Sequence, residues 1–178
     1  MDETLVKKAK KGDEEAFRTL IADLGDSLYR IAFLYVKEKQ AALDLVSETV
    51  FKGYTSLHTL KKDEYFQTWM TRILLNCCKN FVKKQQRVVL YATRSDGSSP
   101  LDDIPAKPAV FVEERLDLYN AIDSLGESNL KSVIILKYFR DLTLPEIARI
   151  MGVPEGTAKS YLHRALTALR TMMEERAI

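Results

Sequence analysis

Apolar side chains recur every three or four positions along most of this chain, which is the spacing of one face of an α-helix. No segment alternates apolar and polar residues over a length that predicts a strand. The pattern therefore predicts an all-α fold. The predicted helices occupy residues 1–11, 13–24, 28–36, 40–54, 64–86, 113–123 and 129–139, and two more lie within 144–169.

Turn-forming residues predict where the early helices end. Gly25 and Asp26 interrupt the apolar spacing and so separate two of the helices. Residues 55–63 have turn chemistry and few core-forming side chains, and Asp63 at their end can cap the helix that follows.

Residues 88–112 differ from the rest of the chain because they combine Ser, Gly, Pro and Asp. This composition cannot continue a helix and predicts a flexible acidic linker. The chain is therefore predicted to contain two small helical domains, residues 1–87 and 113–178, joined by this linker.

The spacing also predicts which side chains face the cores. For 40–54 they are expected on one face, and for 64–86 the expected stripe includes either Trp69 or Met70. The predicted buried sets are Leu43, Val46, Val50 and Tyr54; then Phe66, Trp69 or Met70, Ile73, Cys77 and Phe81; and, in 129–139, Val133, Ile134, Leu136 and Tyr138.

Residues 144–169 predict two helices joined by a tight turn. Thr143 and Glu146 have the spacing of a capping box at the start of the first helix. Gly152 predicts its end, because glycine tolerates the left-handed backbone that a sharp stop needs. Pro154 suits the first turn of the second helix. The segment is either a DNA-binding helix-turn-helix or a plain helical hairpin.

The second of these helices has two distinct faces. An apolar stripe is predicted to pack inward. The opposite face begins with hydrogen-bond donors and basic side chains, which suit a helix that lies in the major groove of DNA. The inward stripe is Ala158, Leu162, Ala165, Leu169 and Met172, and the outward set is Thr157, Lys159, Ser160, His163 and Arg164.

A second basic face is predicted on the helix at 64–86. Basic and amide side chains recur there at helical spacing, and no acidic residue occurs from Cys77 to Thr93. Such a face can follow a nucleic-acid backbone, and nearby aromatic residues can hold unstacked bases. A solvated basic face, with Trp69 in the core, is the alternative. The residues are Arg72, Asn76, Lys79, Asn80 and Lys83, with Tyr65, Phe66 and Trp69 beside them.

Asp44 and Glu48 lie four residues apart on the helix at 40–54, with Leu45 beside them. Paired carboxylates can act as general acid and base or bind a metal. No histidine or third carboxylate stands at a companion spacing, which leaves no cluster to position a substrate. The pair is therefore either a solvated face or a docking surface for a basic partner.

Composition narrows the classes of protein further. The 178 residues are 46% apolar and 29% charged, so the chain can bury a core. Its net charge of +2 is not by itself enough to predict a nucleic-acid partner. The start lacks a signal-peptide pattern, and no apolar run is long enough to span a membrane. Cys77 and Cys78 are adjacent, which fits neither a metal site nor a disulfide framework but suits thiols in a reducing cytoplasm.

Three segments in order resemble a known family: AALDLVSETVFKGY at 41–54, FQTWMTRILLN at 66–76 and LTLPEIARIMGVPEGTAKSYLHRAL at 142–166. Over nearly its whole length the chain resembles a bacterial sigma factor of the extracytoplasmic-function (ECF) group, which has only sigma domains two and four. The resemblance implies a non-catalytic cytoplasmic protein that binds core RNA polymerase and promoter DNA. It implies no cofactor, metal or small-molecule substrate.

The resemblance also implies roles for particular residues. Domain two, 1–87, would dock on the polymerase clamp helices and bind the −10 element, with loop 56–63 receiving a flipped base. Domain four, 113–178, would bind the −35 element, with Tyr161 where the family often has arginine. The implied polymerase-binding residues are Asp44, Leu45 and Glu48; the −10 residues are Trp69, Arg72, Asn76, Lys79, Asn80 and Lys83; and the −35 residues are Thr157, Lys159, Ser160, Tyr161, His163 and Arg164.

An anti-sigma factor, in many cases membrane-anchored, is a further partner that the family implies. Two other functions remain as alternatives from the residues. A free-standing helix-turn-helix regulator would bind a palindromic site without polymerase, and a helical hydrolase would use Asp44 and Glu48.

Overall fold

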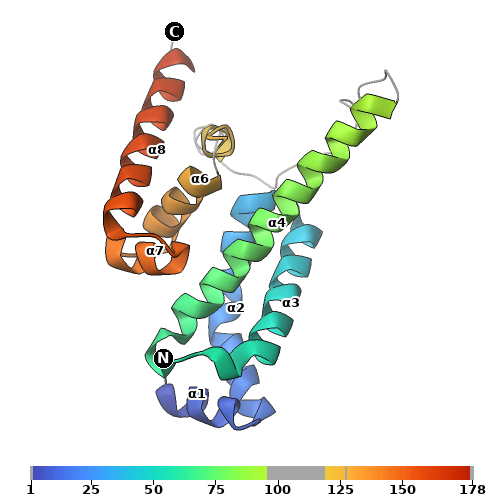
Figure 1. The fold of residues 1–178 in the computed structure, drawn as a ribbon, viewed down its shortest axis with the longest axis vertical. Coiled ribbons are helices and arrows are strands. Elements are labelled where there is room, and N and C mark those ends of the chain that lie inside the picture. The colour runs from blue at the N-terminus through green and yellow to red at the C-terminus, as the bar shows by residue number, and fades with distance from the viewer. Residues whose placement is uncertain (1, 96–118, 127, 177–178) are drawn as a thin grey trace.

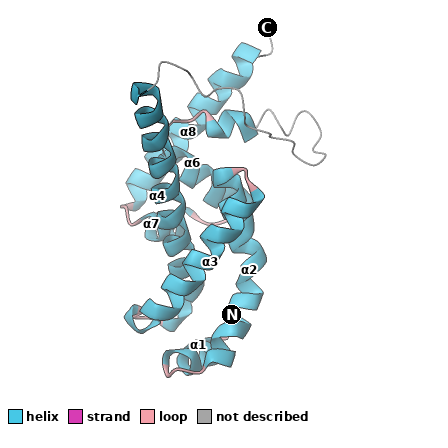
Figure 2. Ribbon diagram, turned by 90° about the vertical axis from the view of Figure 1, so that its right-hand side faces the viewer, coloured by secondary structure: helices cyan, strands magenta, loops and turns pink. Residues whose placement is uncertain are grey.

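The computed structural model describes residues 2–95, 119–126 and 128–176, and every regular element in these ranges is helical (Figures 1 and 2). The predicted all-α fold is therefore confirmed. The elements are α1 (Glu3–Lys10), α2 (Glu14–Val36), α3 (Lys39–Ser56), the 3-10 turns η1 (Leu57–Thr59) and η2 (Asp63–Tyr65), α4 (Phe66–Ser95), α6 (Ser128–Ile134), the π-helical turn η3 (Ile135–Phe139), α7 (Leu144–Met151) and α8 (Glu155–Arg176); residues 119–123 are also helical.

The helices form two groups that lie side by side (Figure 1). In the first, α2, α3 and α4 pack along one another and α1 crosses their end; in the second, α7 and α8 form the hairpin against which α6 packs. The buried side chains of both groups belong to one continuous cluster. The predicted linker is described only as far as residue 95, where α4 ends, so residues 88–95 are helical rather than irregular; the rest of the linker lies outside the described residues.

The predicted break at Gly25 and Asp26 is wrong, because α2 continues through both residues. Leu24 and Leu28 on either side are buried in the core. A glycine inside a helix costs only about 1 kcal/mol relative to alanine, which the packing of these side chains outweighs. Asp13 caps the start of this helix as predicted, since its carboxylate accepts a hydrogen bond from the N–H of Ala16.

The face of α3 that packs inward differs from the prediction. Leu45 and Ala42 are buried, whereas Leu43 is exposed and Val46 and Val50 are only half-buried. The apolar residues of this helix cover more than one face, so spacing alone selects no single stripe. Packing against α2 and α4 decides which of the candidate faces is buried.

Tyr138 was also predicted to face the core and is instead 58% exposed, while Ile135 is fully buried. The cause is η3, because hydrogen-bonded partners in a π-helical turn are five positions apart rather than four, which rotates later side chains away from their α-helical positions. In α4 the choice between Trp69 and Met70 is resolved in favour of Met70, which is fully buried while Trp69 is half-buried.

α3 and α4 approach each other closely at Gly53. A Cβ at this position would lie 2.5 Å from Sδ of Met70, and Met70 has no exposed surface into which it could move. Gly53 is therefore required by packing rather than by a turn. Gly25, in contrast, lies inside α2 with open space around it, since a Cβ there would meet no other atom within 4 Å.

We expect Gly53→Ala to lower the free energy of unfolding by about 1–3 kcal/mol, because the extra methyl group overpacks a closed contact. Gly25→Ala provides the matched control and is expected to raise it by about 0.5–1 kcal/mol through helix propensity. Urea denaturation of the two variants measures both effects. Equal stability of the two variants would contradict the close approach of α3 and α4.

Candidate nucleic-acid and protein interfaces

Asp44 and Glu48 are exposed on α3, as the sequence predicts, but Leu45 is not beside them on the surface. The Leu45 side chain is 3% exposed and packs in the core, which corrects its expected place in a docking face. Asp44 accepts a hydrogen bond from Gln40, and Glu48 pairs with Lys52 one turn later. The hydrogen bond to Glu48 raises the pKa of Lys52.

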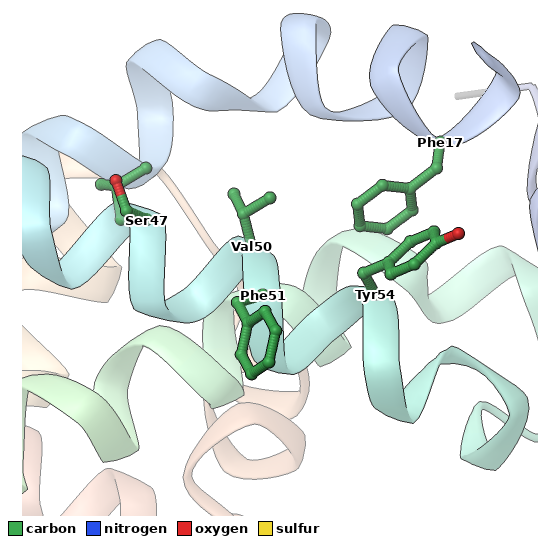
Figure 3. A pocket seen from close by; sticks show the side chains of 6 residues that line it. Phe17, Ser47, Val50, Phe51 and Tyr54 are labelled. Carbon is green, nitrogen blue, oxygen red and sulfur yellow. The ribbon is translucent and has the colours of Figure 1, made fainter. Parts of the chain in front are cut away.

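An apolar hollow lies between α2 and α3, the helix that also carries these carboxylates (Figure 3). Its volume is about 450 Å³. Phe17 extends from α2 towards Tyr54, with the two ring centroids 5.1 Å apart. Phe51 is 68% exposed at its edge and follows Glu48 by three residues on α3, so a large aromatic side chain stands in water about one helical turn from an acidic group. The other lining residues are Val46, Ser47 and Val50.

Exposed apolar side chains that are bordered by charges are typical of protein-binding surfaces. The hollow was missed from the sequence because Val46, Val50 and Tyr54 were assigned to the core. The signal that could have found it is the surplus of apolar residues on α3, more than one buried face can hold.

The segment between α3 and α4 is held from both sides. Leu57 and Leu60, the few core-forming side chains that the segment contains, are both buried. Lys10, at the end of α1, donates hydrogen bonds from Nζ to the carbonyl oxygen of Leu60 (2.8 Å) and to Asp63 (2.9 Å). Asp63 therefore binds α1 instead of capping α4. This anchoring leaves His58 and Thr59 exposed on the turn.

We expect Lys10→Met to loosen this turn, because both hydrogen bonds are made by a charged, partly buried donor. Amide hydrogen exchange of residues 57–65 should become faster by an amount equivalent to about 1–2 kcal/mol of local stability. Lys8→Met, on the exposed side of α1, is the control and should leave exchange of the turn unchanged. Equal exchange in the two variants would show that Lys10 does not hold the turn.

The basic face predicted on α4 forms, with one exception. Arg72, Asn76, Asn80 and Lys83 are exposed at helical spacing. Lys79 is only half-exposed, and burial lowers its pKa. Trp69 is half-buried and tilts against Phe66, with 6.2 Å between ring centroids, so it is both a packing residue and partly accessible.

The predicted helix-turn-helix is present as α7, a turn and α8. Glu146 accepts hydrogen bonds from the N–H and hydroxyl of Thr143, and these bonds lower the Glu146 pKa. Gly152 has φ of 69° and ends α7, as predicted. Pro154 lies immediately before α8, where its carbonyl oxygen accepts hydrogen bonds from the first turn.

On α8, the predicted apolar stripe faces inward. Ala158, Ala165 and Leu169 are buried. On the opposite face, Lys159, Ser160, His163 and Arg164 are exposed, whereas Thr157 and Tyr161 are half-buried.

The basic face of α4 and the helix-turn-helix lie against each other, which nothing in the sequence indicated. Asn129 of α6 accepts a hydrogen bond from Nζ of Lys79 (3.0 Å) and donates one to the hydroxyl of Tyr161 (3.4 Å). A Cβ on Gly152 would lie 3.1 Å from a guanidinium nitrogen of Arg72. The two surfaces predicted to bind nucleic acid are therefore partly in contact.

Within the described ranges, no group of three or more His, Cys, Asp or Glu side chains is placed to hold a metal ion. Over the same part of the chain, no helix has both the length and the apolar character needed to cross a lipid bilayer. Cys77 and Cys78 are both buried and unpaired, and burial raises the pKa of the Cys78 thiol to about 12.

Comparisons with known proteins match both halves of the chain. Residues 20–88 match the family model of sigma-70 region 2, and residues 115–169 match that of sigma-70 region 4. RNA polymerase sigma factor SigV of Bacillus subtilis is 32% identical over 166 residues, which are 93% of this chain and 96% of that protein. The ECF RNA polymerase sigma-E factor of Escherichia coli is 30% identical over 177 residues, covering 94% of this chain and 92% of that protein.

Solved structures share the fold. CnrH, in its complex with the cytosolic domain of CnrY, superposes with a TM-score of 0.71 at 21% identity, covering 98% of this chain and 97% of that one. The sigma factor RpoE of Bartonella quintana, in complex with the anti-sigma factor NepR, has a TM-score of 0.66 at 22% identity, covering 89% of this chain and 96% of that one.

Proposed function

The chain belongs to the ECF group of sigma-70 factors, and on this premise we propose that it binds core RNA polymerase and directs it to promoters by contacts with the −10 and −35 elements. Sigma factors are initiation factors and not enzymes. The observation that carries the proposal is the order of three surfaces along one chain: an acidic and apolar face on α3, a basic face on α4, and a helix-turn-helix.

Core polymerase binds to the α3 face in this proposal. Asp44 and Glu48 supply charge for a basic partner, and the exposed ring of Phe51 supplies the apolar contact that such interfaces place near their centre. Leu45 supports this face from beneath, because its side chain is buried.

The −10 element binds to α4 and the turn that precedes it. Arg72, Lys79 and Lys83 contact phosphates of the opened strand, and Asn76 and Asn80 can contact base edges. The turn at 56–63 receives the flipped base, and the partly accessible Trp69 lies close in sequence to that turn. Opening the duplex costs a few kcal/mol per unstacked base, which these contacts offset.

The −35 element binds to the first turns of α8. Its residues enter the major groove with their apolar backs against α6 and α7. Recognition of the −35 DNA sequence depends on contacts with base edges, whereas contacts with phosphates fix the position of the helix on the duplex. The proposed set is Thr157, Lys159, Ser160, Tyr161, His163 and Arg164.

Residues 1–87 correspond in this proposal to sigma domain two and residues 113–178 to sigma domain four. The protein acts in the cytoplasm with polymerase and takes no cofactor or small-molecule substrate. An anti-sigma factor regulates it, which is supported by the similar fold of RpoE from Bartonella quintana in its complex with the anti-sigma factor NepR. A free-standing regulator is not favoured, because the family matches include region 2 as well as the helix-turn-helix.

Run-off transcription with purified chain, bacterial core polymerase and a genomic promoter library tests the function. We expect RNA that starts at a limited set of sites sharing −10 and −35 sequences, and none with core enzyme alone. Absence of promoter-directed RNA would overturn the proposal, as would tight binding of the chain alone to a palindromic site.

A further inference from the structure

We propose that α1 and the turn at 56–63 form a second phosphate-binding surface, which holds the opened promoter strand on the side of the flipped base that faces away from α4. This surface presupposes the function proposed above, and it extends the contacts with the −10 element to the nucleotides beside it. Four exposed lysines make up the surface, which we call the lysine edge: Lys7 and Lys11 at the end of α1, and Lys61 and Lys62 in the turn.

The two segments are brought together by Lys10. Its Nζ donates hydrogen bonds to the carbonyl oxygen of Leu60 (2.8 Å) and to the carboxylate of Asp63 (2.9 Å). Lys61 and Lys62 lie between these two acceptors in the chain, so the contact fixes them beside the end of α1. Lys10 and Asp63 also neutralise each other, which leaves the neighbouring lysines as the excess charge at this junction.

The lysine edge carries positive charge that the described residues leave largely unmatched. Lys7 and Lys11 are four positions apart, which places their Cβ atoms about 6 Å apart along one face at the end of α1. Lys62 pairs with Glu64 at 3.7 Å. The lysines that form no ion pair with any described residue are Lys7, Lys11 and Lys61. Like charges grouped in this way repel one another, and an anionic partner relieves that repulsion.

The turn separates the lysine edge from the basic face of α4. η2 packs against both α1 and α4, and α1 lies at the end of the bundle where α4 begins (Figure 1). A strand whose flipped base enters the turn therefore has phosphates on α4 to one side and reaches α1 on the other. Positive charge on both sides of the turn fits a continuous strand, whereas a single anion would need only one of the two surfaces.

Contacts with the lysine edge are expected to add affinity without adding sequence preference. Lysine side chains bind phosphates as point charges, and phosphate contacts carry no direct sequence information. Each contact with a single strand releases condensed counterions, so it changes the slope of log affinity against log salt concentration by about 0.7. The number of contacts made by the lysine edge is therefore measured by a change in this slope.

The chain offers matched variants for this test. Lys7→Gln with Lys11→Gln, the charge-removing variant, changes two exposed positions and removes no core contact. Its control combines Lys8→Gln, turned about 100° around α1 from Lys7, with Lys39→Gln at the start of α3, and both positions are exposed. Lys7→Arg with Lys11→Arg, the charge-keeping variant, tests whether the charge itself is what binds.

Each variant is assembled with core polymerase, and fluorescence anisotropy measures its binding to labelled single strands at several salt concentrations. The strands contain a −10 element identified by the transcription experiment. One strand extends beyond the element at both ends, two are trimmed to the element at either the 5′ or the 3′ end, and a fourth is trimmed at both ends. Co-purification first checks that every variant assembles equally with core enzyme.

We expect the charge-removing variant to bind the longest strand about tenfold more weakly than the parent protein at about 0.1 M salt, with a slope shallower by about 1.4. The loss should disappear on one of the strands trimmed at a single end and persist on the other, because the lysine edge lies on one side of the flipped base. The charge-keeping variant and the control should match the parent protein.

Parent-like affinity of the charge-removing variant for the longest strand would overturn the inference. An equal loss in the control, or on all four strands, would overturn it as well, since the effect would then be one of net charge. Loss of co-purification with core polymerase would assign the lysines to that protein instead and would also overturn it. Binding of the parent holoenzyme to the strand trimmed at both ends tests the proposed −10 contacts separately, so the two failures are distinguishable.

Discussion

Replacing Asp44 and Glu48 together with lysine is expected to abolish association with core RNA polymerase while the protein stays folded. Both carboxylates are exposed on α3, so the change removes no core contact. Two unit charges 4 Å apart near a protein surface interact by about 4 kcal/mol, and reversing both charges opposite a basic partner turns attraction into repulsion. A loss of roughly 4 kcal/mol or more corresponds to at least about a thousandfold in affinity.

The double variant, with both Asp44→Lys and Glu48→Lys, is compared with the parent protein by co-purification with core enzyme and by run-off transcription. Its control carries Asp23→Lys and Asp26→Lys, which reverse two exposed carboxylates on α2 and change the net charge equally. We expect the control to bind and transcribe like the parent protein. Parent-like co-purification of the α3 variant would remove this face from the polymerase interface.

Replacing Lys159 and Arg164 with alanine is expected to weaken binding to the −35 element. Each base contact removed costs about 1–3 kcal/mol and relaxes preference at one base pair. If a side chain instead contacts a phosphate, affinity falls equally for all sequences and the salt dependence of binding becomes shallower by about one unit per contact. Both residues lie on the outward face of α8, so the fold should persist.

Titrating duplexes that differ at single −35 positions, at several salt concentrations, separates these outcomes. The control carries Arg18→Ala and Arg170→Ala, two exposed arginines outside the proposed DNA-binding sets whose loss changes the net charge by the same amount. Unchanged affinity and salt dependence in the α8 variant, relative to this control, would contradict the assignment of α8 to the −35 element.

Asn129 is hydrogen-bonded to one residue of each face proposed to bind DNA, so a variant at Lys79 or Tyr161 also changes this contact. Lys79 donates a hydrogen bond to Asn129, and Asn129 donates one to the hydroxyl of Tyr161. In assays with the assembled polymerase, both halves of each variant are bound to the core enzyme. Such assays therefore measure the effect of a substitution on the DNA contact separately from its effect on the free chain.

The helical fold and the helix-turn-helix were predictable because their causes are local. Asp13 caps α2 through a neighbour three residues away, and Glu146 binds Thr143 over the same spacing. Gly152 ends α7 because its own backbone adopts positive φ. Such effects act between residues about one helical turn apart, so they can be predicted from the sequence.

Tertiary packing decided what those local rules leave open. Leu45 is buried and Phe51 exposed because α2 and α4 select one of several apolar faces on α3, and α2 runs through Gly25 because its flanking leucines pack in the core. The contact that Asn129 makes joins residues 50 and 32 positions away. The sequence by itself therefore determined which helices form and where most of them end, whereas only the folded chain determined which of their faces remain available, since burial depends on neighbours that lie far away along the chain.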